Sequence, residues 1–189
     1  DGHPDLVIIS GLAYGIDITA HKSALANNLP TIGVLGHGFK TTYPSVHRPV
    51  ATEMLSAGGL ITDFLSDELP ERNNFIKRNR IIAGISDATL VVESGMRGGA
   101  LITADIAASY NRDVFAVPGR TDDQWSAGCN NLIKRNKAAL VESSDDIGYY
   151  LNWKSDKAKI PVQKVLFSDM PEDERIVYEN ISREGEMNI

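Results

Sequence analysis

Four basic side chains lie close together at the start of one expected helix, and no acidic residue stands among them. They are Arg72, Lys77, Arg78 and Arg80, and Phe75 lies between the first two. The N-terminal end of a helix is positive and favours anions, so cations placed there are unfavourable. Like charges three or four residues apart add further repulsion. The pattern therefore predicts an anion nearby that offsets these costs.

Helical periodicity divides these cations into two groups. The segment 74–85 is expected to be a helix with a stripe of isoleucines in its second half. Arg78 lies one turn before that stripe, so its stem is expected on the buried side in a structural role. Lys77 and Arg80 project from the other side, where they can meet a phosphate.

An aromatic residue beside a cation suits single-stranded nucleic acid, because a base stacks on the ring while a phosphate binds the charge. Phe75 and Arg72 have this arrangement at the loop-to-helix junction. The alternative is that Phe75 belongs to the core and Arg72 pairs with Glu68 or Glu71. We favour the binding role because other strand-end loops repeat the same chemistry.

Glycines open the loop that follows the strand expected at 88–93. Gly95, Gly98 and Gly99 stand there with Arg97 among them, just before an expected helix. Free backbone N–H groups, a positive helix end and a cation are the parts of a phosphate-binding cradle. The loop matches neither the Walker pattern nor GxGxxG, and a glycine-rich turn without a ligand is the alternative.

Two further strand ends carry similar residues. Gly11 follows the strand expected at 6–10, at the start of a helix. Lys40 and Arg48 follow the strand expected at 31–35, in a loop with two glycines. Close helix–sheet packing explains Gly11 about equally well, and an irregular loop on the sheet edge explains the second set about equally well.

Strand and helix patterns alternate along residues 1–153, which predicts one α/β domain with a mostly parallel sheet covered on both faces by helices. In such sheets ligands bind beyond the carboxyl ends of the strands. The expected strands span 6–10, 31–35, 60–64, 88–93, 114–117 and 139–142. The expected helices span 17–28, 45–57, 74–85, 101–111, 130–137 and 145–153.

Composition limits the classes of protein. The chain has 189 residues and a formal net charge of -6, so an anion site must be a local patch. The single cysteine, Cys129, excludes an internal disulfide and suits a reducing cytoplasm. No apolar run is long enough to cross a membrane. The histidines lack metal-ligand spacing, no nucleophile motif is present, and His21 is expected inside a helix in a supporting role.

The C-terminal part of the chain has a different pattern. Residues 154–168 are polar and lysine-containing, and are expected to form a linker. Residues 171–182 are expected to form one amphipathic helix with Pro171 at its first position. A single helix cannot bury its own apolar stripe, so residues 169–189 are expected to be the incomplete start of a small domain.

The strand-end segments together resemble the DprA/Smf family, the DNA-processing protein A family of bacterial natural transformation. The matching segments follow one another in order over residues 6–150, without large gaps. They are Ser10-Gly-Leu-Ala-Tyr-Gly-Ile-Asp17 with His21, Tyr43-Pro-Ser-Val-His-Arg48, Asn74-Phe75 with Arg78-Asn-Arg-Ile-Ile-Ala-Gly84, Gly99-Ala-Leu-Ile-Thr103, and Val114-Phe-Ala-Val-Pro-Gly119 with Gly128-Cys-Asn-Asn-Leu-Ile133.

The resemblance implies an extended Rossmann-like domain that binds single-stranded DNA, forms a homodimer, protects incoming DNA and helps to load the RecA recombinase. It implies a cytoplasmic protein without catalytic turnover, cofactor or membrane contact. The family pattern begins with a further strand and helix before residue 6 and often ends in a winged-helix-like domain. This chain is therefore expected to be part of a longer protein, with its dimer contact within residues 120–150.

The expected DNA-binding strip follows the carboxyl edge of the sheet, with Arg78, His21 and Asn79 in supporting roles. The alternative is a nucleotide hydrolase on the same scaffold, with Glu93 as acid or base and Gly95–Gly99 as the phosphate loop. No second catalytic group at a fixed spacing supports Glu93. The strip consists of Gly11, Lys40, Arg48, Arg72, Phe75, Lys77, Arg80, Arg97, Gly98 and Gly99.

Overall fold

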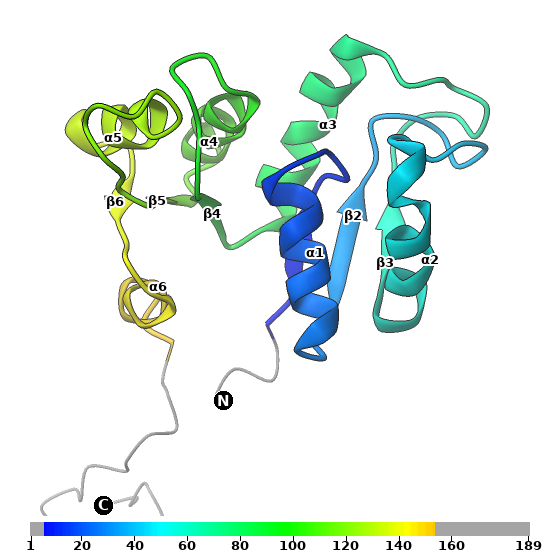
Figure 1. Ribbon diagram of the computed structural model, residues 1–189, viewed down its shortest axis with the longest axis horizontal. Coiled ribbons are helices and arrows are strands. Elements are labelled where there is room, and N and C mark those ends of the chain that lie inside the picture. The colour runs from blue at the N-terminus through cyan, green and yellow to red at the C-terminus, as the bar shows by residue number, and fades with distance from the viewer. Residues whose placement is uncertain (1–5, 154–189) are drawn as a thin grey trace, which may run out of the picture. The chain divides into compact units, whose positions relative to one another are not determined.

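The structure is a computed structural model that describes residues 6–153 (Figure 1). All its strands pair in parallel, which confirms the predicted α/β class. The strands are β1 (Ile8–Ser10), β2 (Thr31–Val34), β3 (Gly58–Ile61), β4 (Ala88–Val91), β5 (Asp113–Ala116) and β6 (Ala139–Leu140). The helices are α1 (Ile16–Ala26), the 3-10 turn η1 (Ser45–His47), α2 (Arg48–Ala57), α3 (Arg72–Ile85), α4 (Gly99–Ser109), α5 (Ala127–Lys134) and α6 (Ser144–Tyr150).

The first sheet has the strand order β1-β2-β3. Ile8 pairs with Thr31, which in turn pairs with Gly58, so the three strands begin at one level. Helix α1 connects β1 to β2, and η1 with α2 connects β2 to β3. The buried core of this half comes from the helices and from the strand ends: Leu12, Ile18, Leu35, Ala51 and Met54.

The second sheet has the strand order β4-β5-β6, with helix α4 between β4 and β5 and helix α5 between β5 and β6. Helix α4 also packs against α3. Small side chains at this contact let the two helix axes approach closely. The core of this half is accordingly rich in alanine: Ala83, Val91, Ala104, Ala107, Val114, Ala116, Cys129, Leu132 and Ala138.

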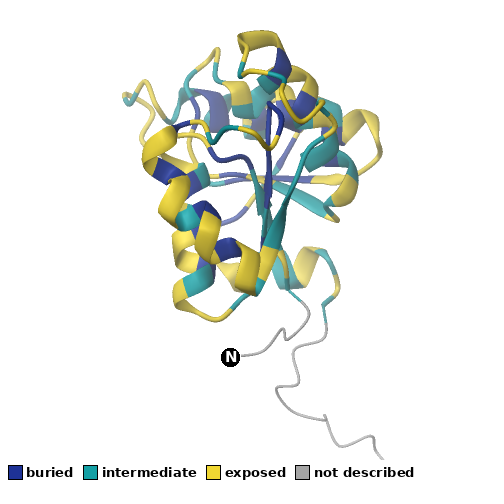
Figure 2. Ribbon diagram, turned by 90° about the vertical axis from the view of Figure 1, so that its right-hand side faces the viewer, coloured by how far each residue is buried: buried dark blue, intermediate teal, exposed yellow. Residues whose placement is uncertain are grey.

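The predicted, mostly parallel sheet consists of two three-stranded sheets within the described residues. β1 and β4 are terminal strands of their sheets, and no strand pairing joins them within residues 6–153. Central strands of a parallel sheet are buried on both faces. By contrast, Val7 beside β1 is 40% exposed and Leu90 in β4 is 41% exposed. Figure 2 shows buried and partly buried strands surrounded by helices whose outer faces are exposed.

Several element boundaries differ from the expected ones. β3 begins at Gly58, directly after α2, and not at residue 60. Because an added Cβ on Gly58 would collide with the Thr31 backbone, this glycine permits close pairing of β3 with β2. The expected helix from residue 45 is divided into η1 and α2, and α5 begins at Ala127 instead of Asn130.

Residues 6–153 belong to one compact unit. The expected linker at 154–168 and the expected small domain at 169–189 lie outside the described residues. Within 6–153, every helix is too short or too polar to cross a lipid bilayer.

Candidate functional site

A cavity of about 160 Å³ lies at the carboxyl ends of β1 and β2. Apolar atoms make up nearly all of its walls, and Arg78 is its one charged lining residue among those described. Four of its lining residues carry aromatic rings: Tyr14, His37, Tyr43 and Phe75. A concave apolar site with few polar groups is the usual form of a ligand pocket. This cavity can therefore receive a planar apolar group.

Phe75 packs against Gly36 and lies beside Tyr43. An added Cβ on Gly36 would lie 2.7 Å from a ring carbon of Phe75, so the missing side chain allows this contact. The ring centroids of Tyr43 and Phe75 are 5.7 Å apart, a normal separation for an aromatic pair. Phe75 is half-buried whereas Tyr43 is 49% exposed. Phe75 thus belongs partly to the core and partly to the cavity wall.

The buried His37 holds the loop that carries Tyr43. Its Nδ1 donates to the carbonyl of Gly38 at 2.8 Å, and its Nε2 accepts the backbone N–H of Tyr43 at 3.2 Å. The second contact requires a neutral ring with an unprotonated Nε2. Sequence reasoning assigned no role to His37, because a histidine between two glycines carries no periodic signal.

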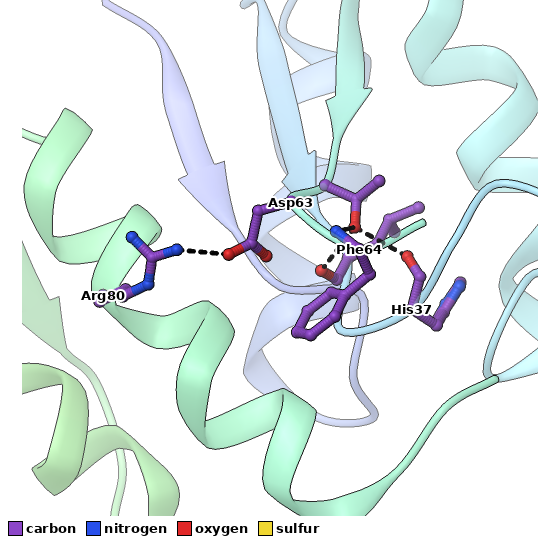
Figure 3. Close-up of polar contacts among 6 residues, drawn as sticks. His37, Asp63, Phe64 and Arg80 are labelled. Carbon is purple, nitrogen blue, oxygen red and sulfur yellow. Dashed lines mark hydrogen bonds and ion pairs between the residues drawn. The ribbon is translucent and has the colours of Figure 1, made fainter. Parts of the chain in front are cut away.

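The end of β3 is tied to the same loop (Figure 3). The hydroxyl of Thr62 donates to the His37 carbonyl at 2.8 Å, and Thr62 Oγ1 accepts the backbone N–H of Phe64 at 3.2 Å. In the same view, Asp63 accepts a hydrogen bond from Arg80 on α3 and forms an ion pair with it. The loops after β2 and β3 are therefore joined to each other, and the loop after β3 is joined to α3.

Arg78 is buried, with 5% of its surface exposed. Its Nη1 donates to the carbonyl of Val34 at the end of β2, and its Nε has no partner among the described residues. Burial lowers the pKa of Arg78, and the Asp17 carboxylate acts in the opposite direction. An added Cβ on Gly11 would touch both the guanidinium and the Asp17 carboxylate. The glycine at position 11 therefore makes room for these side chains.

His21 is also buried and braces the loop after β1. Its Nε2 lies 2.5 Å from the carbonyl of Gly11, and its Nδ1 lies 2.7 Å from Thr31 Oγ1. Burial lowers the pKa of His21, and the hydrogen bond to the Gly11 carbonyl acts in the opposite direction. A carbonyl oxygen can only accept, so Nε2 donates to Gly11. The Thr31 hydroxyl also donates to the carbonyl of Ile8 at 3.0 Å. The ring links α1 to both β1 and β2.

Exposed cations lie in the loop after β2, at the start of α2, on α3 and in the loop before α4. Within residues 6–153, no acidic side chain forms an ion pair with any of five cations: Lys40, Arg48, Arg72, Lys77 and Arg97. Arg72 is the first residue of α3. Glu68, one of its two partners in the alternative interpretation, accepts instead from the Asn74 side chain at 2.9 Å. Arg80 differs from the others because Asp63 already pairs with it.

The loop before α4 is a tight turn. The N–H of Gly98 donates to the carbonyl of Gly95 at 3.1 Å, and an added Cβ on Gly98 would collide with the hydroxyl of Ser94. Gly99 starts α4 and has open space around it, and no side chain caps this helix end. Gly98 therefore has a packing role, while Gly99 leaves the positive helix end accessible.

The described residues provide few groups for catalysis. Glu93 is exposed and has no recorded hydrogen bond or ion pair with Arg97. Cys129 is buried, and burial raises the pKa of its thiol. Asn79 is half-buried on α3. Within residues 6–153, no group of three His, Cys, Asp or Glu side chains is arranged to hold a metal ion.

The parallel strand order defines an α/β protein. Its candidate ligand site is the cavity at the carboxyl ends of β1 and β2, where ligands of such sheets usually bind. The chain belongs to the family of DNA recombination-mediator protein A, whose sequence profile matches residues 3–152. The resemblance to the DprA/Smf family is thereby confirmed.

Curated relatives carry the family's names. Protein Smf of Synechocystis is 45% identical over 140 residues, which are 74% of this chain and 35% of that protein. DNA processing protein DprA of Streptococcus pneumoniae is 41% identical over 143 residues, 76% of this chain and 50% of that protein. A putative DNA processing protein DprA of Mycobacterium tuberculosis is 37% identical over 186 residues, 98% of this chain and 48% of that protein. The chain thus spans at most about half the length of these relatives.

Two solved structures share the fold. The crystal structure of DprA from Streptococcus pneumoniae has a TM-score of 0.70 and 40% identity, and the match covers 76% of this chain and 50% of that chain. A structure of DNA processing protein A from Helicobacter pylori has a TM-score of 0.70 and 27% identity, with 77% of this chain and 66% of that chain covered. The latter is described as giving insight into the single-stranded DNA binding mode of that protein.

Proposed function

We propose that this chain binds single-stranded DNA along the carboxyl ends of its strands. The observation that carries the proposal is the aromatic cavity at β1 and β2, formed by segments that also bear unpaired cations. A base that leaves the stack can enter beside Tyr43 and Phe75, while phosphates bind the cations. Bases in a duplex are paired and stacked, so they cannot enter in this way. The Helicobacter pylori relative supports the same activity.

The phosphate contacts are assigned to the exposed cations and to the open helix end. Each contact to a phosphate releases counterions, so affinity falls as salt rises. Gly11 and Gly98 contribute by allowing close packing of the loops, and Arg78, His21 and Asn79 support the loops from inside. The proposed contacts are Lys40, Arg48, Arg72, Lys77, Arg80, Arg97 and the N–H of Gly99.

A charge reversal tests this assignment. In Lys77→Glu we expect affinity for a single-stranded oligonucleotide to fall about tenfold at low salt, and the salt dependence to become shallower by about one phosphate contact. Lys22→Glu is the matched control, because Lys22 is an exposed lysine in the middle of α1 and lies outside the expected dimer contact. Equal affinity of Lys77→Glu and the control for the oligonucleotide would contradict the assignment of Lys77 to the DNA-binding strip.

The proposal includes the biological role that the family name suggests. We place this chain in a cytoplasmic protein of DNA uptake that self-associates, protects incoming strands and helps RecA to assemble on them without chemical turnover. The membership in the recombination-mediator family supports this role. With the full-length protein, light scattering should give a dimer, and RecA should assemble sooner on DNA coated with single-strand-binding protein. An unchanged RecA lag would contradict the mediator role.

A further inference from the structure

We propose that Trp125 is a second base-binding site, which stacks one unpaired base of single-stranded DNA at the carboxyl ends of β4 and β5. This inference rests on the proposed binding of single-stranded DNA and extends the contact from the first sheet to the second. The exposure of the indole, its fixed position and the anion-binding groups in the adjoining loop each support the assignment.

The indole of Trp125 is exposed on the loop between β5 and α5. Trp125 is 57% exposed, although tryptophan side chains are highly buried on average in folded proteins. The ring lies beside the loop after β4, because a Cβ added to Gly95 would lie 3.9 Å from the ring carbon Cε3. Met96, the next residue of that loop, is 56% exposed. Two large apolar side chains are therefore open to a ligand at this end of the second sheet.

Hydrogen bonds on both sides of Trp125 fix its backbone. Its carbonyl accepts the N–H of Ser94 at 2.9 Å, and its own N–H donates to the Asp123 carboxylate at 3.1 Å. The hydroxyl of Ser126 donates to the same carboxylate at 2.6 Å. A side chain whose backbone is fixed before binding loses less freedom when a ligand stacks on it. The loop therefore presents the indole in a defined position.

Groups that bind phosphate lie in the loop beside the indole. Arg97 is exposed and forms no ion pair with an acidic side chain of residues 6–153. Gly99 begins α4 with open space around it and no side-chain cap. The two acids nearest the ring in sequence are already bound, since Asp122 pairs with Arg120 at 3.0 Å and Asp123 accepts the bonds described above. A nucleotide of a single strand supplies a base for the ring and a phosphate for the cation.

Tryptophan fluorescence reports the contact directly, because a base that stacks on an indole quenches its emission. The chain contains two tryptophans, Trp125 and Trp153. We would titrate the 189-residue chain with oligothymidylate at low salt, and follow tryptophan emission and the anisotropy of a labelled strand in parallel. The emission of the wild type should fall with the same midpoint as the anisotropy change. This quenching should be lost in Trp125→Ala.

Three variants separate stacking from a structural role of the ring. Trp125→Ala should bind oligothymidylate about tenfold more weakly, and should bind a fully abasic strand of the same length as the wild type does. Trp125→Phe keeps an aromatic face and should lose less than about threefold. Leu55→Ala is the matched control, because Leu55 is a 61% exposed apolar residue in the last turn of α2, and neither affinity should change. Circular dichroism checks that all three variants fold.

The outcomes distinguish this inference from the proposed function. Unchanged tryptophan emission while the strand binds would overturn the inference, and so would wild-type affinity of Trp125→Ala for oligothymidylate. An equal loss of affinity for the abasic strand would show a structural role of the ring and would also overturn it. Loss of self-association in light scattering with unchanged DNA affinity would assign the ring to a protein contact, against this inference. Absence of binding by the wild-type chain to any single strand would overturn the proposed function, and this inference with it.

Discussion

The guanidinium of Arg78 and the carboxylate of Asp17 lie over the same face of Gly11, where a methyl group would touch both. This arrangement joins the loop after β1, the first turn of α1 and the middle of α3. Ser10 adds a hydrogen bond of 2.9 Å to the Asp17 carboxylate. A glycine at position 11 is therefore required for the close packing of Arg78 and Asp17 against this loop.

Gly11→Ala should destabilise the fold, because the new methyl group forces the guanidinium or the carboxylate away from its partners. Overpacking of this kind costs about 1–3 kcal/mol in the free energy of unfolding, which urea denaturation measures. Gly99→Ala is the control, since the space around Gly99 is open. It should be neutral or stabilising by up to about 1 kcal/mol at a helical position. Equal stability of the two variants would contradict the packing role of Gly11.

Asp63→Asn should raise the affinity for single-stranded DNA by about threefold at low salt, because Arg80 loses its internal counter-ion and a negative charge leaves the edge. Arg80 is 54% exposed at its side chain, so this ion pair contributes little to stability. Asp87→Asn removes the same charge from the pair with Arg112, whose atoms lie 3.8 Å apart.

Both variants remove one negative charge, so the difference between their affinities reports the contribution of Arg80 alone. If Asp63→Asn binds no better than Asp87→Asn, then Arg80 does not contact phosphate. Oligonucleotide titrations at low salt provide both affinities.

The buried His21 should make stability depend on pH. Burial lowers the pKa of His21 in the folded state below its ordinary value of 6.5. The unfolded chain then binds more protons in the window between the two values, so the free energy of unfolding falls as pH decreases through 6.5 and stops falling below the folded-state pKa. Within that window the loss is about 1.4 kcal/mol per pH unit.

His21→Gln removes this titration. The variant should be less stable than the wild type near neutral pH, because the bonds to Gly11 and Thr31 are altered. Its stability should decline less between about pH 7 and pH 5, the range in which histidines titrate. Urea denaturation at several pH values measures both effects. A parallel decline in the two proteins would mean that His21 does not carry the pH dependence.

Local patterns in the sequence predict the fold class well, because alternation of strands and helices is visible over short windows. Helical spacing likewise puts Arg78 on the side that the structure buries. The division into two sheets is not predictable in this way, since it depends on whether β1 and β4 pair. The sequence of one strand does not reveal which distant strand it pairs with.

The candidate site is only partly visible in the sequence for the same reason. Phe75 and the cations form a local cluster, which composition reveals. The ion pair of Arg80 with Asp63 depends on how α3 lies beside the end of β3, and the two residues are separated by 17 positions. The role of His37 depends on a loop that folds back to its own imidazole. Such tertiary contacts require the structure.

The central claim is that the carboxyl edge binds single-stranded DNA. A fluorescence anisotropy titration of a labelled single strand, and of the same sequence as a duplex, at low and at physiological salt tests it most directly. We predict that the single strand binds more tightly than the duplex and that its affinity falls steeply with salt. We also predict that Lys77→Glu weakens binding while Lys22→Glu does not. Equal binding of strand and duplex, or wild-type binding by Lys77→Glu, would contradict the claim.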